Sequence, residues 1–157
     1  MKERTLVIIK PDALQRNLLG EIVGRFEKKG LKIVGLKMVR LSDVLLNEHY
    51  GHHKDKPFFT GLKNFMKSAP VVVMVAEGLE AIQVTRVIVG PTSGRVALGG
   101  TIRGDLCIST QANIVHASDS LVAARAEIKR FFTPRELFDY QKADFHFTYG
   151  EEERALV

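Results

Sequence analysis

The amino-acid sequence predicts an α+β fold of the ferredoxin-like type, in which a split βαββαβ order gives a four-stranded antiparallel sheet covered by helices. Two observations lead to this fold class. Short β-branched apolar runs alternate with segments of helical periodicity along the chain. The 157 residues have the length of one compact domain, and neither a repeat nor a low-complexity linker divides residues 1–157. We expect a single domain whose helices pack on one face of the sheet.

The first third of the chain has the pattern of a strand, a helix and a second strand. Residues 5–10 (TLVIIK) are β-branched and apolar, which predicts a buried strand. Residues 19–29 place apolar side chains at helical spacing, and Gly30 is suited to end that helix. Residues 31–39 alternate apolar residues with lysines, which indicates a strand with one exposed face and a bulge near Gly35.

The middle of the chain predicts a helical hairpin, a strand and a helix. A serine–aspartate pair can cap the first helix of the hairpin, residues 42–50, and Pro57 can open the second, residues 57–66. The fully apolar run at residues 71–75 indicates another buried strand. Residues 80–89 then have the length and pattern of a helix.

A long ordered loop is expected next, because residues 90–113 contain five glycines and few periodic apolar residues. Long loops in compact domains are usually functional. Residues 114–116 predict a short strand. A helix that Ser118 or Asp119 can cap then runs to Phe131.

Composition and charge narrow the possible functions. The net charge of +5 favours anionic partners but does not distinguish nucleotides, nucleic acid and membrane surfaces. The only cysteine, Cys107, excludes an intrachain disulfide, and the longest apolar run, residues 71–76, is far too short to span a bilayer. We expect a cytoplasmic protein that does not bind a membrane. Glycine-rich phosphate loops, dinucleotide fingerprints, CxxC pairs and HExxH motifs are absent, so nucleotide chemistry would depend on side chains.

Three basic residues stand where they could bind an anion. Lys10 ends the first expected strand, Arg86 interrupts an apolar helix, and Arg103 lies near glycines that permit close approach of a ligand. Guanidinium groups suit bidentate contacts with phosphate oxygens. Each residue also fits a simpler role, as a solvated lysine or as an arginine in a surface ion pair, for which Asp105 is a partner.

His116 is the candidate nucleophile, because it lies between a short strand and a helix start whose amides can hold an anion. Glu127 follows on the same side of that helix as Ser120. A carboxylate there could orient the imidazole and fix its tautomer. A core histidine bonded to the backbone explains His116 equally well.

Histidines and aromatic residues crowd the segment EHYGHHKDKPFF. His49, His52 and His53 have a spacing that could present imidazoles to a metal, but a helix C-terminus also favours histidines through its dipole. Phe58 and Tyr50 fit core packing as well as contact with a ligand. We expect no dedicated metal site.

Four segments together resemble the nucleoside diphosphate kinase family: IKPDA, EHYGHHKDKPFF, GTIRGD and NIVHASDS, in this order between residues 8 and 120. The resemblance extends over almost the entire chain. It implies a two-step exchange in which His116 takes the γ-phosphoryl group of a nucleoside triphosphate, typically ATP, and passes it to a nucleoside diphosphate. Mg²⁺ would arrive on the β- and γ-phosphates rather than in a protein cage. A homo-oligomer is implied, and we expect a hexamer rather than a tetramer.

The resemblance also implies a role for each matching residue. Glu127, held by Ser118, would orient the catalytic imidazole. Phe58 would stack on the base, with Leu62 beside it. The positions that would contact phosphates and ribose are Lys10, Tyr50, Arg86, Thr92, Arg103 and Asn113, with Lys10 and Asn113 on the sugar side.

The chain departs from the family pattern at four positions. Ala117 replaces the glycine of HGSD, and Thr110 stands across from Phe58, where an apolar residue is usual. Gly94 and Gly99 replace prolines. Proline at either position is expected to stabilise the protein if the native φ is near −65°.

Two other functions remain open at this point. A basic split βαββαβ sheet is also the scaffold of RNA-recognition domains, although no strand here carries their paired aromatic residues. His116 could instead belong to a histidine phosphocarrier or regulatory protein that a partner phosphorylates. Turnover of nucleotides without a partner protein would separate these alternatives from the enzyme.

Overall fold

The computed structural model describes residues 1–157 and contains four strands and nine α-helices. The strands are β1 (Lys2–Ile9), β2 (Lys32–Val39), β3 (Val71–Leu79) and β4 (Val115–Ala117). The helices are α1 (Pro11–Gln15), α2 (Leu19–Lys28), α3 (Asp43–His49), α4 (Phe59–Lys67), α5 (Ala81–Val89), α6 (Ile102–Leu106), α7 (Leu121–Phe131), α8 (Phe145–Thr148) and α9 (Glu151–Arg154). Single turns of 3₁₀ helix lie at Gly51–His53, Gly94–Val96 and Pro134–Glu136.

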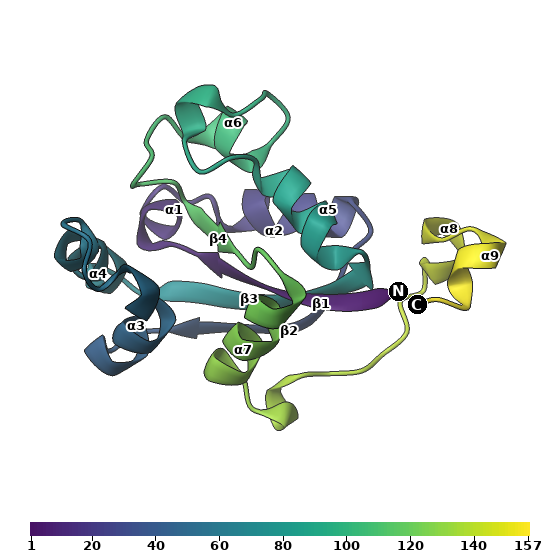
Figure 1. Ribbon diagram of the computed structural model, residues 1–157. Coiled ribbons are helices and arrows are strands. Elements are labelled where there is room, and N and C mark those ends of the chain that lie inside the picture. The colour runs from purple at the N-terminus through teal and green to yellow at the C-terminus, as the bar shows by residue number, and fades with distance from the viewer.

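The strands form one antiparallel sheet in the order β2-β3-β1-β4 (Figure 1). This is the arrangement of a split βαββαβ fold, so the predicted fold class is confirmed. β1 lies between β3 and β4, and the short strand β4 pairs only with β1. That pairing places His116 opposite Ile8, on an edge strand of the sheet.

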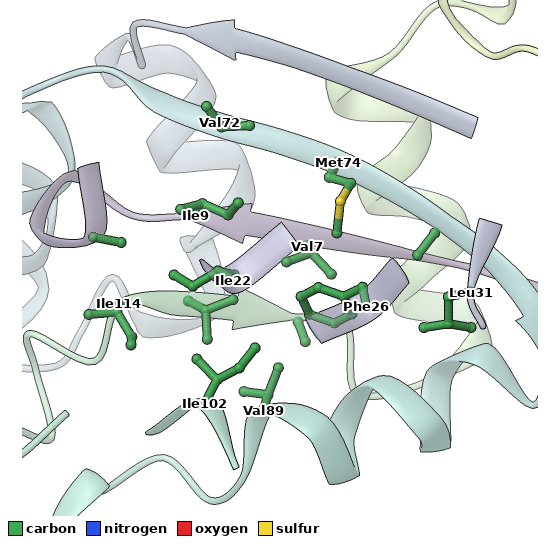
Figure 2. Close-up of a cluster of buried hydrophobic side chains, with 14 of the residues drawn as sticks. Val7, Ile9, Ile22, Phe26, Leu31, Val72, Met74, Val89, Ile102 and Ile114 are labelled. Atoms are coloured by element: carbon green, nitrogen blue, oxygen red, sulfur yellow. The ribbon is translucent and has the colours of Figure 1, made fainter. Parts of the chain in front are cut away.

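Helices cover both faces of the sheet, so the expectation that they pack on one face was wrong (Figure 1). Val7 and Ile9 of β1 point into a core with α2 and α5, where Phe26 is fully buried (Figure 2). Leu6 and Ile8 point into a second core, which includes residues of α3, α4 and α7. The physical reason lies in the sequence of β1 and β3, because strands that are apolar at every position must be covered on both faces.

β2 contains the bulge that was expected, since its register shifts between Ile33 and Gly35. A Cβ on residue 35 would lie 2.9 Å from Leu137 Cδ2, so the glycine lets the later chain pack against the strand. The exposed face of β2 carries two apolar side chains, Leu36 and Met38, where the sequence pattern indicated lysines.

β1 and β3 are longer than expected at the end of the sheet remote from His116. β1 begins at Lys2 rather than at residue 5, and β3 continues to Leu79 rather than ending at residue 75. Charged residues take part in this extension: Arg4 Nε donates to Oε2 of the buried Glu77 across the strands at 2.7 Å. Paired charges can be buried, so they did not end the strands.

The positions of the short helices differ from the prediction near two prolines and in the glycine-rich loop. Pro11 is the first residue of the short helix α1, whereas Pro57 precedes α4 without opening it. The expected loop at residues 90–113 contains α6, which Thr101 caps by accepting from Gly104 N at 2.9 Å. A helix of five residues is too short to show apolar periodicity.

The cap of α7 is Ser120 rather than Ser118 or Asp119. Its Oγ accepts from Ala123 N at 3.1 Å. Ser118 is buried and serves the site described below. The two chain ends meet beyond the sheet, where Lys2 N donates to Leu156 O at 3.1 Å (Figure 1). None of the helices has the length and apolar character needed to cross a membrane.

Candidate functional site

A cavity of about 590 Å³ lies where β4, α7, α5 and the end of α3 converge. It collects most of the residues that sequence reasoning singled out. Those lining it are Lys10, Tyr50, Arg86, Thr92, Arg103, Asn113, His116 and Glu127. Sheet pairing fixes the position of His116, which lies within β4 rather than after it.

His116 is held by a carboxylate on α7. Its Nε2 lies 3.1 Å from Glu127 Oε1 and 3.2 Å from Oε2. The Ser118 hydroxyl donates to Glu127 Oε2 at 2.6 Å, and Leu6 N donates to Ser118 Oγ at 3.2 Å, which anchors the group to the sheet. Nδ1 of His116 makes no hydrogen bond to the protein. If Nε2 donates to Glu127, Nδ1 carries the lone pair.

The environment keeps Glu127 ionised. Burial acts to raise its pKa, but the hydrogen bonds that Glu127 accepts from His116 and Ser118 outweigh burial and hold that pKa below its usual range. An ionised carboxylate is the form that accepts both hydrogen bonds.

His49 is a member of this group that sequence reasoning did not place there. Its ring is buried and stands edge-on to His116, with the ring centroids 4.8 Å apart. Its Nδ1 lies 4.0 Å from Glu127 Oε1 and 3.3 Å from Arg130 Nη1. Burial first, and then the neighbouring His116, lower the pKa of His49 to about 3, so the ring is neutral at physiological pH. No sequence signal indicates this position, because α3 and β4 are distant along the chain.

The possible metal site at His49, His52 and His53 is not formed. The rings of His52 and His53 lie against each other with centroids 3.9 Å apart, while His49 faces the other way, towards His116. The nitrogen and oxygen atoms of His49, His116 and Glu127 do lie within 4.8 Å of one another. Both carboxylate oxygens of Glu127 are within hydrogen-bond distance of His116 Nε2, and Oε2 also accepts from Ser118, so Glu127 already has protein partners. Nε2 of His49 is buried without a hydrogen-bond partner.

Lys10 and Asn113 form one unit on the other side of the cavity. Lys10 Nζ donates to Asn113 Oδ1 at 2.6 Å, and Asn113 Nδ2 donates to the carbonyls of Thr92 and Thr110 at 3.0 and 2.8 Å. Burial, and to a lesser extent the charge of Arg103, lower the pKa of Lys10 to about 8. Lys10 is therefore a buried cation that loses its charge far more readily than a surface lysine.

The two candidate arginines differ in the number of hydrogen bonds that they make to the protein. Arg103 donates to three backbone carbonyls, those of Asn113 (3.3 Å), Gly90 (2.9 Å) and Val115 (2.6 Å). Burial and the nearby Arg86 lower its pKa to about 10, which leaves it charged at neutral pH. Arg86 makes no hydrogen bond or ion pair. Its guanidinium is the unpaired cation of the cavity.

The backbone beside the site is strained at Ile114, which adopts a φ of 58°, a left-handed conformation unusual for a β-branched residue. Its neighbours enforce this conformation. Ile114 N donates to Asp12 Oδ2 at 3.1 Å, and Lys10 N donates to Ile114 O at 2.9 Å. The IKPD segment thus determines how the chain enters β4.

A second cavity, of about 540 Å³, adjoins the first and is lined by Phe58, Leu62, Thr110 and Gln111. It shares with the first cavity Lys10, Tyr50, His53, Thr92 and Asn113. Phe58 is half exposed and its ring faces that of His53 at 5.4 Å. The hydroxyl of Tyr50, at the boundary of the two cavities, is buried without a hydrogen-bond partner.

Two of the four departures from the family pattern are now explained. Ala117 pairs with Val7 in the sheet and has no positive φ, so glycine is not required there. A Cβ on Gly94 would overlap the carbonyl of Cys107, and Gly94 N donates to Ser109 O at 3.4 Å. The expectation that proline stabilises position 94 was therefore wrong.

The fold and these two cavities define a class of protein: a split-sheet α+β protein in which an imidazole held by a carboxylate lies beside a cavity lined with cations. Comparisons with known proteins identify one family. The family model described as nucleoside diphosphate kinase matches residues 3–137. The nucleoside diphosphate kinase of Parabacteroides distasonis is 54% identical, covering 96% of this chain and 99% of its own. Nucleoside diphosphate kinase A of Mus musculus is 50% identical, covering 94% and 97%.

Solved structures agree with the sequence comparisons. The halophilic nucleoside diphosphate kinase of Halobacterium salinarum, in complex with CDP, superposes with a TM-score of 0.93 at 44% identity, covering 96% of this chain and 100% of that one. The family protein from Babesia bovis gives a TM-score of 0.90 at 44% identity, covering 94% and 99%. This chain belongs to the nucleoside diphosphate kinase family and is an enzyme, a nucleotide-binding kinase.

Proposed function

We propose that this enzyme transfers the γ-phosphoryl group of a nucleoside triphosphate, typically ATP, to a nucleoside diphosphate through a phosphohistidine at His116. One observation carries the proposal. The imidazole binds the Glu127 carboxylate through Nε2, while Nδ1 is free beside a cavity lined with cations. This leaves one nucleophilic nitrogen, and its position is fixed by the sheet.

In the first half of the exchange, the lone pair of Nδ1 attacks the γ-phosphorus. A P–N bond forms, the bond to the β-γ bridging oxygen breaks, and the diphosphate leaves with that oxygen. The imidazole gains positive charge and keeps the Nε2 proton, which the ionised Glu127 stabilises. In the second half a different diphosphate attacks the phosphohistidine and restores the free imidazole. One cavity serves both halves.

The charged groups divide the work of binding. Arg86, which has no partner in the protein, is free to contact the transferred phosphate, and the Tyr50 hydroxyl can donate to a phosphate oxygen. Lys10 and Asn113 stand as a pair for the ribose and phosphates. Because phosphoryl transfer spreads charge over the equatorial oxygens, such fixed donors stabilise the transition state. Arg103 holds the loop and retains two unused N–H groups.

Mg²⁺ fits this site as a part of the substrate. The acidic residues of the first cavity are Glu48, Asp119 and Glu127, and Glu127 is occupied by His116 and Ser118. The remaining two do not make a carboxylate cage. We expect the ion to be bound by the β- and γ-phosphates, whose charge it neutralises.

The alternatives are less well supported. An RNA-recognition sheet needs an open face for stacking bases, whereas both faces of this sheet are covered by hydrophobic cores. A phosphocarrier would need only an accessible histidine. The adjoining cavity beside Phe58 and the unpaired Arg86 favour a small nucleotide instead.

We also propose that the enzyme is a homo-oligomer, and a hexamer rather than a tetramer. The edge strand β2 exposes Leu36 and Met38, and the 94–108 region exposes Val96, Leu98 and Ile108. Exposed apolar side chains on an edge strand and on a loop are suited to subunit contacts.

The test is phosphoryl labelling followed by exchange. Incubation with ATP and Mg²⁺ should leave one acid-labile, base-stable phosphoryl group per chain, which added diphosphate removes. His116→Ala should abolish labelling and exchange. Glu127→Ala should slow transfer about ten- to a thousandfold, because the ring loses its orienting partner. Near-parental exchange in the His116→Ala enzyme, or a label on His49, His52 or His53, would show that the nucleophile is a different residue.

A further inference from the structure

The cavity beside Phe58 is lined on one side by two polar residues that the first cavity does not share. Thr110 and Gln111 line it from the loop after Cys107, and Phe58, which precedes α4, and Leu62 of α4 line it as well. Gln111 Nε2 lies 3.6 Å from the position that a Cβ on Gly61 would take. Gly61 lies between Phe58 and Leu62 in the sequence, so the amide of Gln111 reaches the start of α4, beside the residue on which a base would stack.

The loop holds this amide in place while leaving it free to bind. Ser109 Oγ accepts from Gln111 N at 3.2 Å and from Ala112 N at 3.1 Å, and the Thr110 carbonyl accepts from Asn113 Nδ2 at 2.8 Å. These contacts fix the backbone on both sides of Gln111. Its side-chain amide has no hydrogen bond to the protein, so its donor and its acceptor are both available.

We propose that Gln111 is a base-contacting residue that strengthens the binding of every nucleobase without selecting among them. This inference rests on the proposed function. Cytosine and adenine present an exocyclic amino donor, whereas uracil and guanine present a carbonyl acceptor at the corresponding edge. A primary amide matches either kind of group after a half-turn about its last torsion. Stacking on Phe58 adds affinity that likewise does not depend on which base is bound.

The sharpest test converts this amide into a group that only accepts. A carboxylate at position 111 can accept from the amino group of cytosine but is repelled by the carbonyl of uracil. CDP and UDP have the same size and phosphate charge, so any general repulsion by the new carboxylate cancels in their ratio. We expect comparable kcat/KM for CDP and UDP in the parent enzyme with ATP as donor. Gln111→Glu should raise the CDP/UDP ratio about three- to tenfold, the effect of one hydrogen bond.

Two further variants separate readout from structure. Gln111→Leu should raise KM and the calorimetric Kd for both nucleotides about three- to tenfold, with kcat and melting temperature unchanged. Gln141→Glu makes the same charge change in the C-terminal segment, away from this cavity, and should leave the CDP/UDP ratio at its parental value.

A flat CDP/UDP ratio in Gln111→Glu, or parental Kd values in Gln111→Leu, would overturn the inference. Failure of the proposed function has a different signature. In that case the parent would bind CDP in a Gln111-dependent manner and yet exchange no phosphate.

Discussion

At the scale of single residues, the cations of the site differ in how far the protein already uses them. Arg103 donates hydrogen bonds from three of its N–H groups to the carbonyls of Gly90, Asn113 and Val115. These bonds join the end of α5 to the start of β4. Arg86, four residues before Gly90, has no protein partner. The same residue type therefore serves stability in one case and the ligand in the other, which sequence alone could not distinguish.

This difference predicts opposite outcomes for two matched substitutions. Arg103→Met leaves three carbonyls without their donor and should lower the free energy of unfolding by about 2–5 kcal/mol. Arg86→Met breaks no contact in the protein and should leave that free energy within about 0.5 kcal/mol of the parent. It should instead lower kcat/KM about ten- to a hundredfold, the worth of a charged hydrogen bond. Denaturant titration and steady-state kinetics measure the two effects, and equal destabilisation by both variants would contradict the assignment.

Lys10 predicts a pH dependence. Its pKa is lowered to about 8, so the free enzyme loses this charge as the pH rises through that value. Because kcat/KM reports groups of the free enzyme, we expect it to decline above a pH of about 8. Lys10→Arg keeps its charge over this range and should remove the decline. The profile should be measured at constant ionic strength, and an unchanged alkaline limb in Lys10→Arg would assign the titration to another group.

At the scale of elements, the sequence predicted the long segments well because each carries several apolar residues of one period. The bulge at Gly35 and the helix of residues 121–131 followed from such local signals. Elements of five residues, such as α6, did not, because one turn has no period to detect. His49 is uncharged because it is buried against β4. No local sequence pattern indicates that contact.

The covering of both sheet faces could also have been predicted. The runs LVII in β1 and VVVMVA in β3 are apolar at consecutive positions, which excludes a face exposed to water. The candidate site was predictable through motif resemblance, since each motif is short but its residue types are specific. Only the three-dimensional contacts show which of these residues are hydrogen-bonded to the protein and which are available to a ligand.

The two loop glycines give a prediction at this scale. Leu98 O accepts from Thr101 N at 3.2 Å, and Gly100 has a φ of 89° whereas Gly99 has no positive φ, which is a type II turn with Gly99 at its second position. Proline is favoured at that position, and a Cβ there meets nothing closer than 3.9 Å. Gly99→Pro should therefore stabilise the protein by about 0.4–1 kcal/mol.

Gly94→Pro, in the same loop, should have the opposite effect on stability. It removes the donor to Ser109 and places a Cβ against the Cys107 carbonyl, so it should lower the melting temperature. Scanning calorimetry of both variants measures the contrast. A lower melting temperature for Gly99→Pro would show that the turn at residues 98–101 tolerates no restriction at its second position.

At the scale of the whole molecule, the two cores leave the edge of the sheet as the surface that needs covering. β2 lies at that edge, and its exposed face carries Leu36 and Met38, each about half exposed or more. Native proteins rarely leave a flat apolar edge strand in water, because it invites pairing with another chain. The cavity that contains His116 lies among β4, α5 and α7, at the opposite edge, so assembly through β2 would leave it open.

This geometry predicts that the edge of β2 holds subunits together. Light scattering should give a mass of about 105 kDa for six chains of 17.5 kDa. Met38→Glu buries a charge in the proposed contact and should reduce that mass to a smaller species, because an unpaired charge at an apolar interface is strongly unfavourable. Val44→Glu, at an exposed apolar residue of α3, serves as the control and should keep the parental mass. Since β2 does not line the cavity, the smaller species should still form the phosphohistidine, and a Met38→Glu enzyme of unchanged mass would exclude β2 as the interface.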